Sequence, residues 1–171
     1  MEYDVVIVGA GPAGLTTAIK LKQLDSNLNV CILEKGSEVG AHILSGNVFE
    51  TKALDEILPK WKEQGAPIKT KVSKEKFLFL GKNSSLSWPT WLLPSVQKNH
   101  KNYIISLANL CRWLAEQAEK LGVEIFPGFP ASEILYREDG SVKGVATLDM
   151  GLDKNGNKKE GYQEGMELHA K

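Results

Sequence analysis

Short runs of consecutive apolar residues near the start of the chain indicate two buried strands. Residues 5–8 and 30–33 are unbroken apolar runs, and such runs are typical of parallel strands that are covered on both faces. Between them, small and apolar residues recur at helical spacing up to a polar stop at 25–27, which predicts a strand, a helix and a second strand. The residues expected on the buried face of this helix are Gly14, Thr17, Ala18, Leu21 and Leu24.

A longer helix with a regular apolar stripe is predicted from 107 to 121. Ser106 and Gly122 are suitable residues for its two ends, and the segment 123–126 predicts the strand that follows. The stripe consists of Leu107, Leu110, Cys111, Leu114, Ala118 and Leu121. A shorter helix is predicted over 53–61, ended or kinked by the proline within it.

The last third of the chain has the pattern of antiparallel strands joined by polar turns. Strands are predicted at 131–136, 142–149 and 163–170, with glycine-containing turns between them. The whole pattern predicts an α/β fold of the Rossmann type with a β-meander.

The turn after the first strand carries the most specific motif of the chain. Gly9, Gly11 and Gly14 form a G-x-G-x-x-G sequence directly between the predicted strand and helix. The first glycine permits a tight turn, the second lets a pyrophosphate approach the backbone, and the third lets the helix pack closely on the strand. Pro12 suits a first helical turn, where the amides and the helix dipole favour an anion. The motif, which includes Ala13, therefore predicts a dinucleotide site.

An acidic residue strengthens this prediction, because Glu34 follows Gly14 by 20 residues and ends the second strand. An acid at this spacing accepts hydrogen bonds from a ribose hydroxyl. The motif alone leaves FAD and NAD open, although the loop 35–46 is rich in small residues that permit close approach to a ligand. Lys35 could instead pair with the 2′-phosphate of NADP, but Glu34 would repel that group.

Composition narrows the possible functions further. Lysine plus arginine equals aspartate plus glutamate at 21 each, so the overall charge gives no reason to expect nucleic acid. Cys31 and Cys111 fall within regular elements, where buried reduced thiols are expected. His42, His100 and His169 are scattered, so we expect no metal site, no nucleophile and no acid–base catalyst. From the acidic start of the chain we expect no secretory or transit segment. A redox flavoprotein needs none of these groups, because its cofactor carries the chemistry.

A second unusual segment runs from 77 to 94. An apolar run at 77–80, a polar turn and a stretch containing Trp88 and Trp91 predict a hairpin that is too short and proline-rich to span a membrane. From the residues alone we favour a core cover or a substrate lid over a membrane contact. The membrane alternative stays open because tryptophan prefers the membrane interface. Lysines also surround the segment: Lys74, Lys76, Lys82, Lys98 and Lys101.

Several segments together resemble the N-terminal part of the electron-transfer flavoprotein:ubiquinone oxidoreductase family, over the whole chain. The glycine motif is shared by many flavoproteins, whereas the other segments are more particular. The segments that carry the resemblance are 5–14, Glu34-Lys35, 40–46, 61–67, Trp113, 116–119, Gly122-Val123 and 165–171. Some animal members have an arginine where this chain has Ser106, which favours a bacterial member.

The resemblance implies an FAD enzyme with a [4Fe-4S] cluster that passes electrons from reduced electron-transfer flavoprotein to ubiquinone. It implies a monotopic membrane surface as a further partner, on the cytoplasmic face of a bacterial inner membrane or the matrix side of the mitochondrial one. It also reverses the preference for the hairpin, which would face the membrane. The implied membrane-facing residues are Phe77, Phe79, Trp88, Trp91, Leu92 and Leu93. The implied cofactor-binding residues are Gly9, Gly11, Pro12, Ala13, Gly14, Glu34, Lys35, Ser45 and Gly46.

The resemblance also implies how the chain is organised. Residues 1–171 would form the N-terminal part of the FAD-binding domain, with 67–102 belonging to a quinone- and membrane-facing subdomain. Two cysteines cannot supply the four that the family's cluster needs, so we expect a fragment that is incomplete at its C-terminus and inactive alone. Two alternatives remain, a geranylgeranyl-reductase-like FAD reductase and a non-catalytic dinucleotide-binding module.

Overall fold

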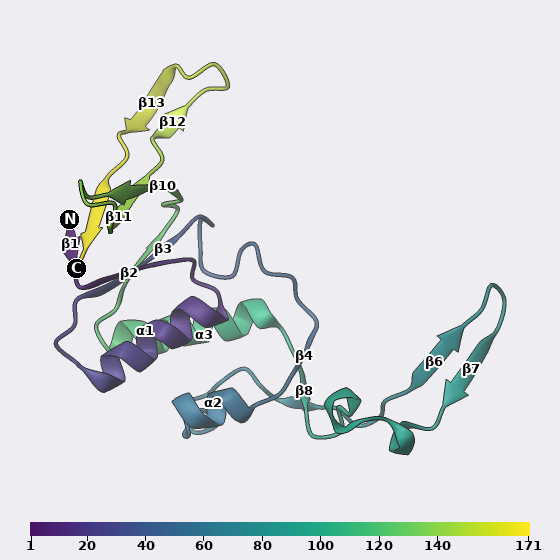
Figure 1. Cartoon of the computed structure of the whole chain (residues 1–171). Helices are drawn as coiled ribbons and strands as arrows, with labels where there is room; N and C mark the ends of the chain where they lie inside the picture. The colour runs from purple at the N-terminus through teal and green to yellow at the C-terminus, as the bar shows by residue number, and fades with distance from the viewer. The chain divides into compact units, whose positions relative to one another are not determined.

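The computed structural model describes residues 1–171, which divide into two compact units. The first unit comprises Met1–Ile43 and Cys111–Lys171, and the second comprises Leu44–Leu110. Figure 1 labels the elements of both units, which are taken one at a time below. No helix of the chain is long and apolar enough to cross a membrane.

A parallel sheet organises the first unit. Its strands are β2 (Val5–Val8), β3 (Val30–Glu34) and β9 (Glu124–Pro127), paired in that order with all directions parallel. Helix α1 (Pro12–Leu24) connects β2 to β3, and α3 (Leu107–Lys120) precedes β9. Right-handed crossovers that proceed in one direction along a sheet place their helices on the same face, as Figure 1 shows for α1 and α3. The predicted Rossmann-type α/β arrangement is therefore confirmed.

A second sheet, antiparallel except for one parallel edge strand, covers the opposite face of the parallel one. Its order is β1-β14-β11-β10, and a separate two-stranded ribbon, β12-β13, extends beyond it. The bounds are β1 (Glu2–Tyr3), β10 (Ala131–Tyr136), β11 (Val142–Thr147), β12 (Met150–Leu152), β13 (Lys158–Gln163) and β14 (Glu167–Ala170). The predicted third strand, 163–170, is wrong in its bounds, because the chain breaks between β13 and β14. Within this break Asp149 Oδ1 accepts the Gly165 amide at 2.7 Å.

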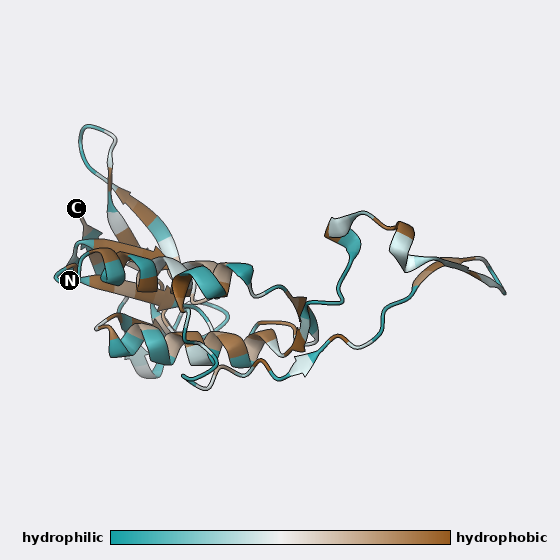
Figure 2. Cartoon of the chain, turned by 90° about the horizontal axis from the view of Figure 1, so that it is seen from below, coloured by the Kyte–Doolittle hydropathy of each residue, from teal (hydrophilic) through white to brown (hydrophobic).

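The core of the first unit lies on both faces of β3. Cys31 and Leu33 pack with Tyr3 and Leu168 of the antiparallel sheet. Alternation along the strand directs its other apolar residues, Val30 and Ile32, to the helical face. All four apolar residues of β3 are at most 1% exposed. In Figure 2 hydrophobic colouring runs along the strands of this sheet, as expected for parallel strands with both faces covered.

Helix α1 buries a different face from the predicted one. Its buried residues are Leu15, Ala18 and Ile19, whereas Thr17 is exposed and Leu24 is 73% exposed. The predicted stripe was therefore displaced by one position along the helix. Two overlapping stripes satisfy helical spacing here, and only packing on the sheet selects between them.

The longer helix agrees with its prediction at both ends. Ser106 Oγ accepts the amide of Asn109 at 3.4 Å, and Gly122 has a φ of +81° just beyond the end of the helix. The amide of Val123 donates to Ala118 O at 3.1 Å. A left-handed glycine with such a hydrogen bond ends many helices, and it turns the chain into β9.

The second unit is built on a small antiparallel sheet of order β4-β8-β5. The strands are β4 (Asn47–Phe49), β5 (Thr70–Lys71) and β8 (Tyr103–Ile105), and α2 covers Lys52–Ile57. The helix is shorter than the predicted 53–61, yet Trp61 beyond its end is still buried at 2% exposure. The Trp61 ring packs edge-on against that of Tyr103 with centroids 6.1 Å apart.

The predicted hairpin is present in the second unit. It pairs β6 (Phe77–Leu80) with β7 (Ser85–Trp88) in antiparallel register, followed by the short 3₁₀ helices η1 (Thr90–Leu92) and η2 (Ser95–Gln97). Figure 2 colours these segments by hydropathy. Phe79 packs edge-on against both Phe77 and Trp88 while staying 53% exposed.

One residue of the hairpin segment departs from its predicted role. Trp91 is 74% exposed and Leu92 is 50% exposed, but Leu93 is only 8% exposed. The prediction that Leu93 faces a membrane is therefore wrong. The chain leaves η1 at Leu93 in an extended conformation, with φ −69° and ψ 146°, whereas Trp91 and Leu92 lie within the 3₁₀ helix.

Both cysteines are free and fully buried. Burial raises the pKa of the Cys111 thiol to about 11, and the carboxylate of Glu34 adds to the shift. Burial likewise raises the pKa of Cys31 to about 12, assisted by Glu124. Because a thiol reacts as its thiolate, we expect neither cysteine to react with a disulfide reagent at pH 8 until the protein is unfolded. Rapid reaction of one thiol in the folded protein would contradict this burial.

Candidate dinucleotide site at the glycine-rich turn

The glycine-rich turn stands at the carboxyl end of β2, where ligands of parallel α/β sheets bind. Gly9 has a φ of +100°, which a side chain would disfavour, and its amide donates to Leu33 O at 2.7 Å. A Cβ on Gly14 would lie 2.1 Å from Gly9 O and 3.2 Å from Ile7 Cγ2. Both glycines are therefore required by the protein's own packing, as the motif predicted.

Gly11 is different, because the protein alone does not require a glycine there. A Cβ on Gly11 would have no atom within 4 Å, and the residue has an ordinary extended conformation with φ −78° and ψ 178°. A ligand bound against the backbone would explain why this position has a glycine, which has no side chain. This turn therefore fits the pyrophosphate of a dinucleotide, because such a group needs the space that a Cβ would fill.

The start of α1 supplies hydrogen-bond donors at the same place. Gly11 is the N-terminal cap and Pro12 is the first helical residue. The amide of Leu15 donates to Gly11 O at 3.0 Å, so the amides of Ala13 and Gly14 precede the helical hydrogen-bond ladder. Amides in this position, together with the helix dipole, favour an anion.

Glu34 lies beside this turn, as the spacing predicted. Its Oε2 accepts the amide of Ala10 at 2.9 Å, and its Oε1 accepts the amide of Gly36 at 2.7 Å. The carboxylate thus joins the glycine-rich turn to the loop that follows β3. Each oxygen retains further acceptor capacity, so the side chain can also accept from a hydroxyl group.

The other residues that were predicted to bind the cofactor are Lys35, Ser45 and Gly46. Lys35 is exposed. Ser45 and Gly46 belong to the second unit, where Gly46 has a φ of +83° that favours glycine. Their predicted role at the cofactor stays a prediction.

Sequence reasoning missed two residues of the site, because the amides of Ala10 and Gly36 hold Glu34. It also missed an ion pair in which Arg112 Nη2 lies 2.8 Å from Glu38 Oε1 and joins α3 to the loop after β3. The sequence signal for the contact of Gly36 was the glycine itself, which follows Glu34 by two positions. A Cβ on Gly36 would lie 3.1 Å from Glu34 Oε1. No pattern in the sequence indicated the ion pair, which depends on the packing of α3.

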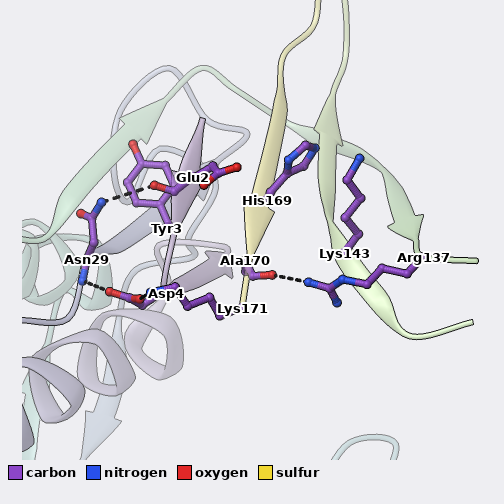
Figure 3. A pocket seen from close by; sticks show the side chains of 9 residues that line it. All are labelled: Glu2, Tyr3, Asp4, Asn29, Arg137, Lys143, His169, Ala170 and Lys171. Carbon is purple, nitrogen blue, oxygen red and sulfur yellow. Dashed lines mark hydrogen bonds and ion pairs between the residues drawn. The ribbon is translucent and has the colours of Figure 1, made fainter. Parts of the chain in front are cut away.

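A cavity of about 500 Å³ lies elsewhere in the first unit. Figure 3 shows that Asp4 and Asn29, which stand before β2 and β3, line it together with residues of the antiparallel sheet. It is therefore at the amino ends of the parallel strands, opposite the glycine-rich turn. Two of its charged groups are already engaged: the Asn29 amide and then Lys171 hold the pKa of Asp4 below its usual value, and Arg137 donates to Ala170 O at 3.0 Å. We assign this cavity no role at the dinucleotide site.

Solved structures share this fold at low sequence identity. A geranylgeranyl bacteriochlorophyll reductase-like protein from Thermoplasma acidophilum superposes with a TM-score of 0.65 at 22% identity, over 99% of this chain and 37% of that one. A myxobacterial chondrochloren halogenase, described as a variant of FAD-dependent halogenases, has a TM-score of 0.60 at 16% identity, over 99% and 36%. At these identities the likeness establishes the fold alone.

Sequence comparison is more specific. A family model described as an NAD(P)-binding Rossmann-like domain matches residues 7–58. The electron transfer flavoprotein-ubiquinone oxidoreductase of rice mitochondria is 57% identical over 100% of this chain, and that of Pseudomonas aeruginosa is 56% identical over 100%. These near-equal values do not separate bacterial from mitochondrial members. The chain spans 30% and 32% of the length of these two relatives. Since relatives of one name match the whole chain at 50–57% identity, the chain belongs to the electron transfer flavoprotein-ubiquinone oxidoreductase family.

Proposed function

We propose that this chain binds FAD and, within a longer protein, takes part in passing electrons from reduced electron-transfer flavoprotein to ubiquinone. The observation that carries the proposal is the match of the whole chain to relatives of that name at 50–57% identity. The glycine-rich turn supplies an independent reason, because Gly11 has the open backbone that a pyrophosphate needs. Because the chain spans about 30% of those relatives, we infer that activity requires residues beyond these 171.

Different residues of the first unit would bind different parts of FAD. The amides of Ala13 and Gly14 would donate to the pyrophosphate, and Gly11 would leave it room. Glu34 would accept from the ribose while its bonds to Ala10 and Gly36 hold it in place. The flavin supplies the electron-transfer chemistry when bound. Lys35, Ser45 and Gly46 remain proposed contributors, on the family resemblance alone.

Two further features of the family remain proposals for this chain. Its residues contain no group of three metal-ligating side chains, so we propose that the [4Fe-4S] cluster takes its ligands from other parts of the longer protein. We also propose that residues 67–102 belong to a quinone- and membrane-facing subdomain, with Phe77, Phe79, Trp88, Trp91 and Leu92 toward the membrane. The protein would then lie on a respiratory membrane, on the cytoplasmic side in bacteria or the matrix side in mitochondria.

Replacing Glu34 by alanine is expected to weaken FAD binding by about 1–3 kcal/mol, because a hydrogen bond to a charged carboxylate is lost. Fluorescence titration of FAD into the deflavinated protein measures the change. Glu38→Ala is a matched control in the same loop, since its exposed ion pair with Arg112 should contribute little. Equal affinities of the Glu34→Ala protein and the unchanged protein would place the ribose contact elsewhere.

The proposed reaction is tested with the full-length protein that contains these residues. We expect released FAD in stoichiometric amount, and reduction of ubiquinone that depends on reduced electron-transfer flavoprotein. Reduction of isoprenoid double bonds without quinone would instead indicate a reductase like the one that shares this fold. Bound dinucleotide without any electron transfer would indicate a non-catalytic binding module.

A further inference from the structure

The neutral composition of the chain conceals a strongly basic segment in the second unit. Residues 69–101 contain seven lysines, one glutamate and neither arginine nor aspartate, so their net charge is +6 in a chain whose total is zero. The one acid, Glu75, is engaged, because its Oε2 accepts the amide of Asn99 at 2.7 Å. This segment therefore carries an uncompensated positive charge next to the exposed hairpin.

Two of these lysines line a cavity of about 320 Å³ at the base of the hairpin. The cavity is formed by Val72, Ser73, Lys74, Glu75, Lys76, Thr90 and His100. Five of its lining residues, Ser73, Lys74, Lys76, Thr90 and His100, have side chains that can donate hydrogen bonds, and Glu75 supplies its one carboxylate. Such a donor set suits a phosphate group, for which lysine is a common ligand.

The cavity adjoins exposed apolar side chains. Thr90 begins η1, whose next two residues, Trp91 and Leu92, are 74% and 50% exposed. Lys98 Nζ donates to Trp91 O at 3.2 Å, which holds a further ammonium group beside the tryptophan. On the other side, Lys76 is followed directly by β6. Positive and apolar groups therefore share one small region of the second unit.

We propose that the cavity of 72–76, Thr90 and His100 receives the phosphate of an anionic phospholipid while Trp91 and Leu92 enter the acyl boundary. The proposal rests on the membrane contact proposed above and adds to it a preference for negatively charged lipid. Basic residues beside exposed tryptophan and leucine are the combination that binds anionic membrane surfaces. An acidic protein partner is the less favoured occupant, because it would leave the tryptophan and leucine without an apolar environment.

The test compares vesicles of phosphatidylcholine with vesicles in which roughly one third of the lipid is phosphatidylglycerol. We expect the full-length protein to sediment preferentially with the anionic vesicles, and added salt to reduce this preference. The double variant Lys74→Gln/Lys76→Gln should bind anionic vesicles about 25-fold more weakly, since each lysine near such a surface contributes about five-fold. The control Lys158→Gln/Lys159→Gln removes the same charge from β13 in the first unit and should change binding little.

Other outcomes would overturn the lipid preference. Equal binding of the unchanged protein to both kinds of vesicle would do so, as would equal losses in the two double variants. If glycerol 3-phosphate displaced the protein from vesicles and bound it as tightly as the anionic vesicles do, the cavity would be a site for a free phosphate. The lysines would belong to a protein-docking surface if Lys74→Gln/Lys76→Gln bound reduced electron-transfer flavoprotein more weakly and bound vesicles unchanged.

The test separates this proposal from the proposed reaction. Ubiquinone reduction in detergent does not require the vesicle surface, so Lys74→Gln/Lys76→Gln should retain it. Preferential binding to anionic vesicles by a protein that reduces no ubiquinone would overturn the reaction and support the lipid preference. Normal reduction by a protein that is indifferent to lipid charge would support the reaction and overturn the lipid preference.

Discussion

Replacing Gly11 by valine is expected to leave the protein folded and almost free of FAD. The extended backbone of Gly11 is one that valine adopts readily, and a new Cβ would meet no protein atom within 4 Å. The side chain would instead occupy the space needed by the pyrophosphate. We expect affinity for FAD to fall by at least about 100-fold, which corresponds to roughly 3 kcal/mol of lost phosphate contacts. Flavin absorbance of the purified protein and its thermal unfolding measure the two effects separately.

Gly14→Ala provides the matched comparison. Its Cβ would lie 2.1 Å from Gly9 O, a backbone atom that cannot move aside without displacing α1 from β2. We therefore expect this smaller substitution to lower the melting temperature, and to lose FAD through damage to the fold. Undiminished flavin absorbance in Gly11→Val would show that the turn does not hold the cofactor. A large loss of stability in Gly11→Val would show that the protein itself requires this glycine.

The second large effect is expected from Trp91→Ser combined with Leu92→Ser. Each apolar side chain contributes roughly 1.5–3 kcal/mol when it is fully removed from water, so losing both should nearly abolish binding to vesicles. Folding should be little affected, because both side chains are exposed in the protein itself, by 74% and 50%. Sedimentation with liposomes and the melting temperature of the full-length protein measure these two expectations.

Leu93→Ser is the control within the same segment. Leu93 is 8% exposed, so a serine there should lower the melting temperature through lost burial. A Trp91→Ser/Leu92→Ser protein that keeps its liposome binding and loses thermal stability would show that the segment packs against the protein. The membrane contact would then be wrong.

The sequence by itself determined those features that depend on neighbours in the chain. The apolar run before Gly9, the spacing to Glu34 and the capping residues Ser106 and Gly122 act locally, since each constrains its own strand, turn or helix end. The structure has all of them where the pattern predicts. The family relationship also follows from sequence, because it is a property of residue order over the whole chain.

Only the tertiary structure decided which of several allowed faces is buried and which distant groups meet. Helix α1 carries two overlapping stripes at helical spacing, and packing on β3 selected the one that contains Leu15. Leu93 could not be told from Leu92 in the sequence, because both are leucines and the turn of the backbone after η1 separates their exposure. The hydrogen bond from the Ala10 amide to Glu34 joins residues 24 positions apart in the chain, and the cavity lined by both Lys74 and Thr90 likewise joins separate segments. Periodicity describes single elements, whereas such contacts depend on how elements pack together.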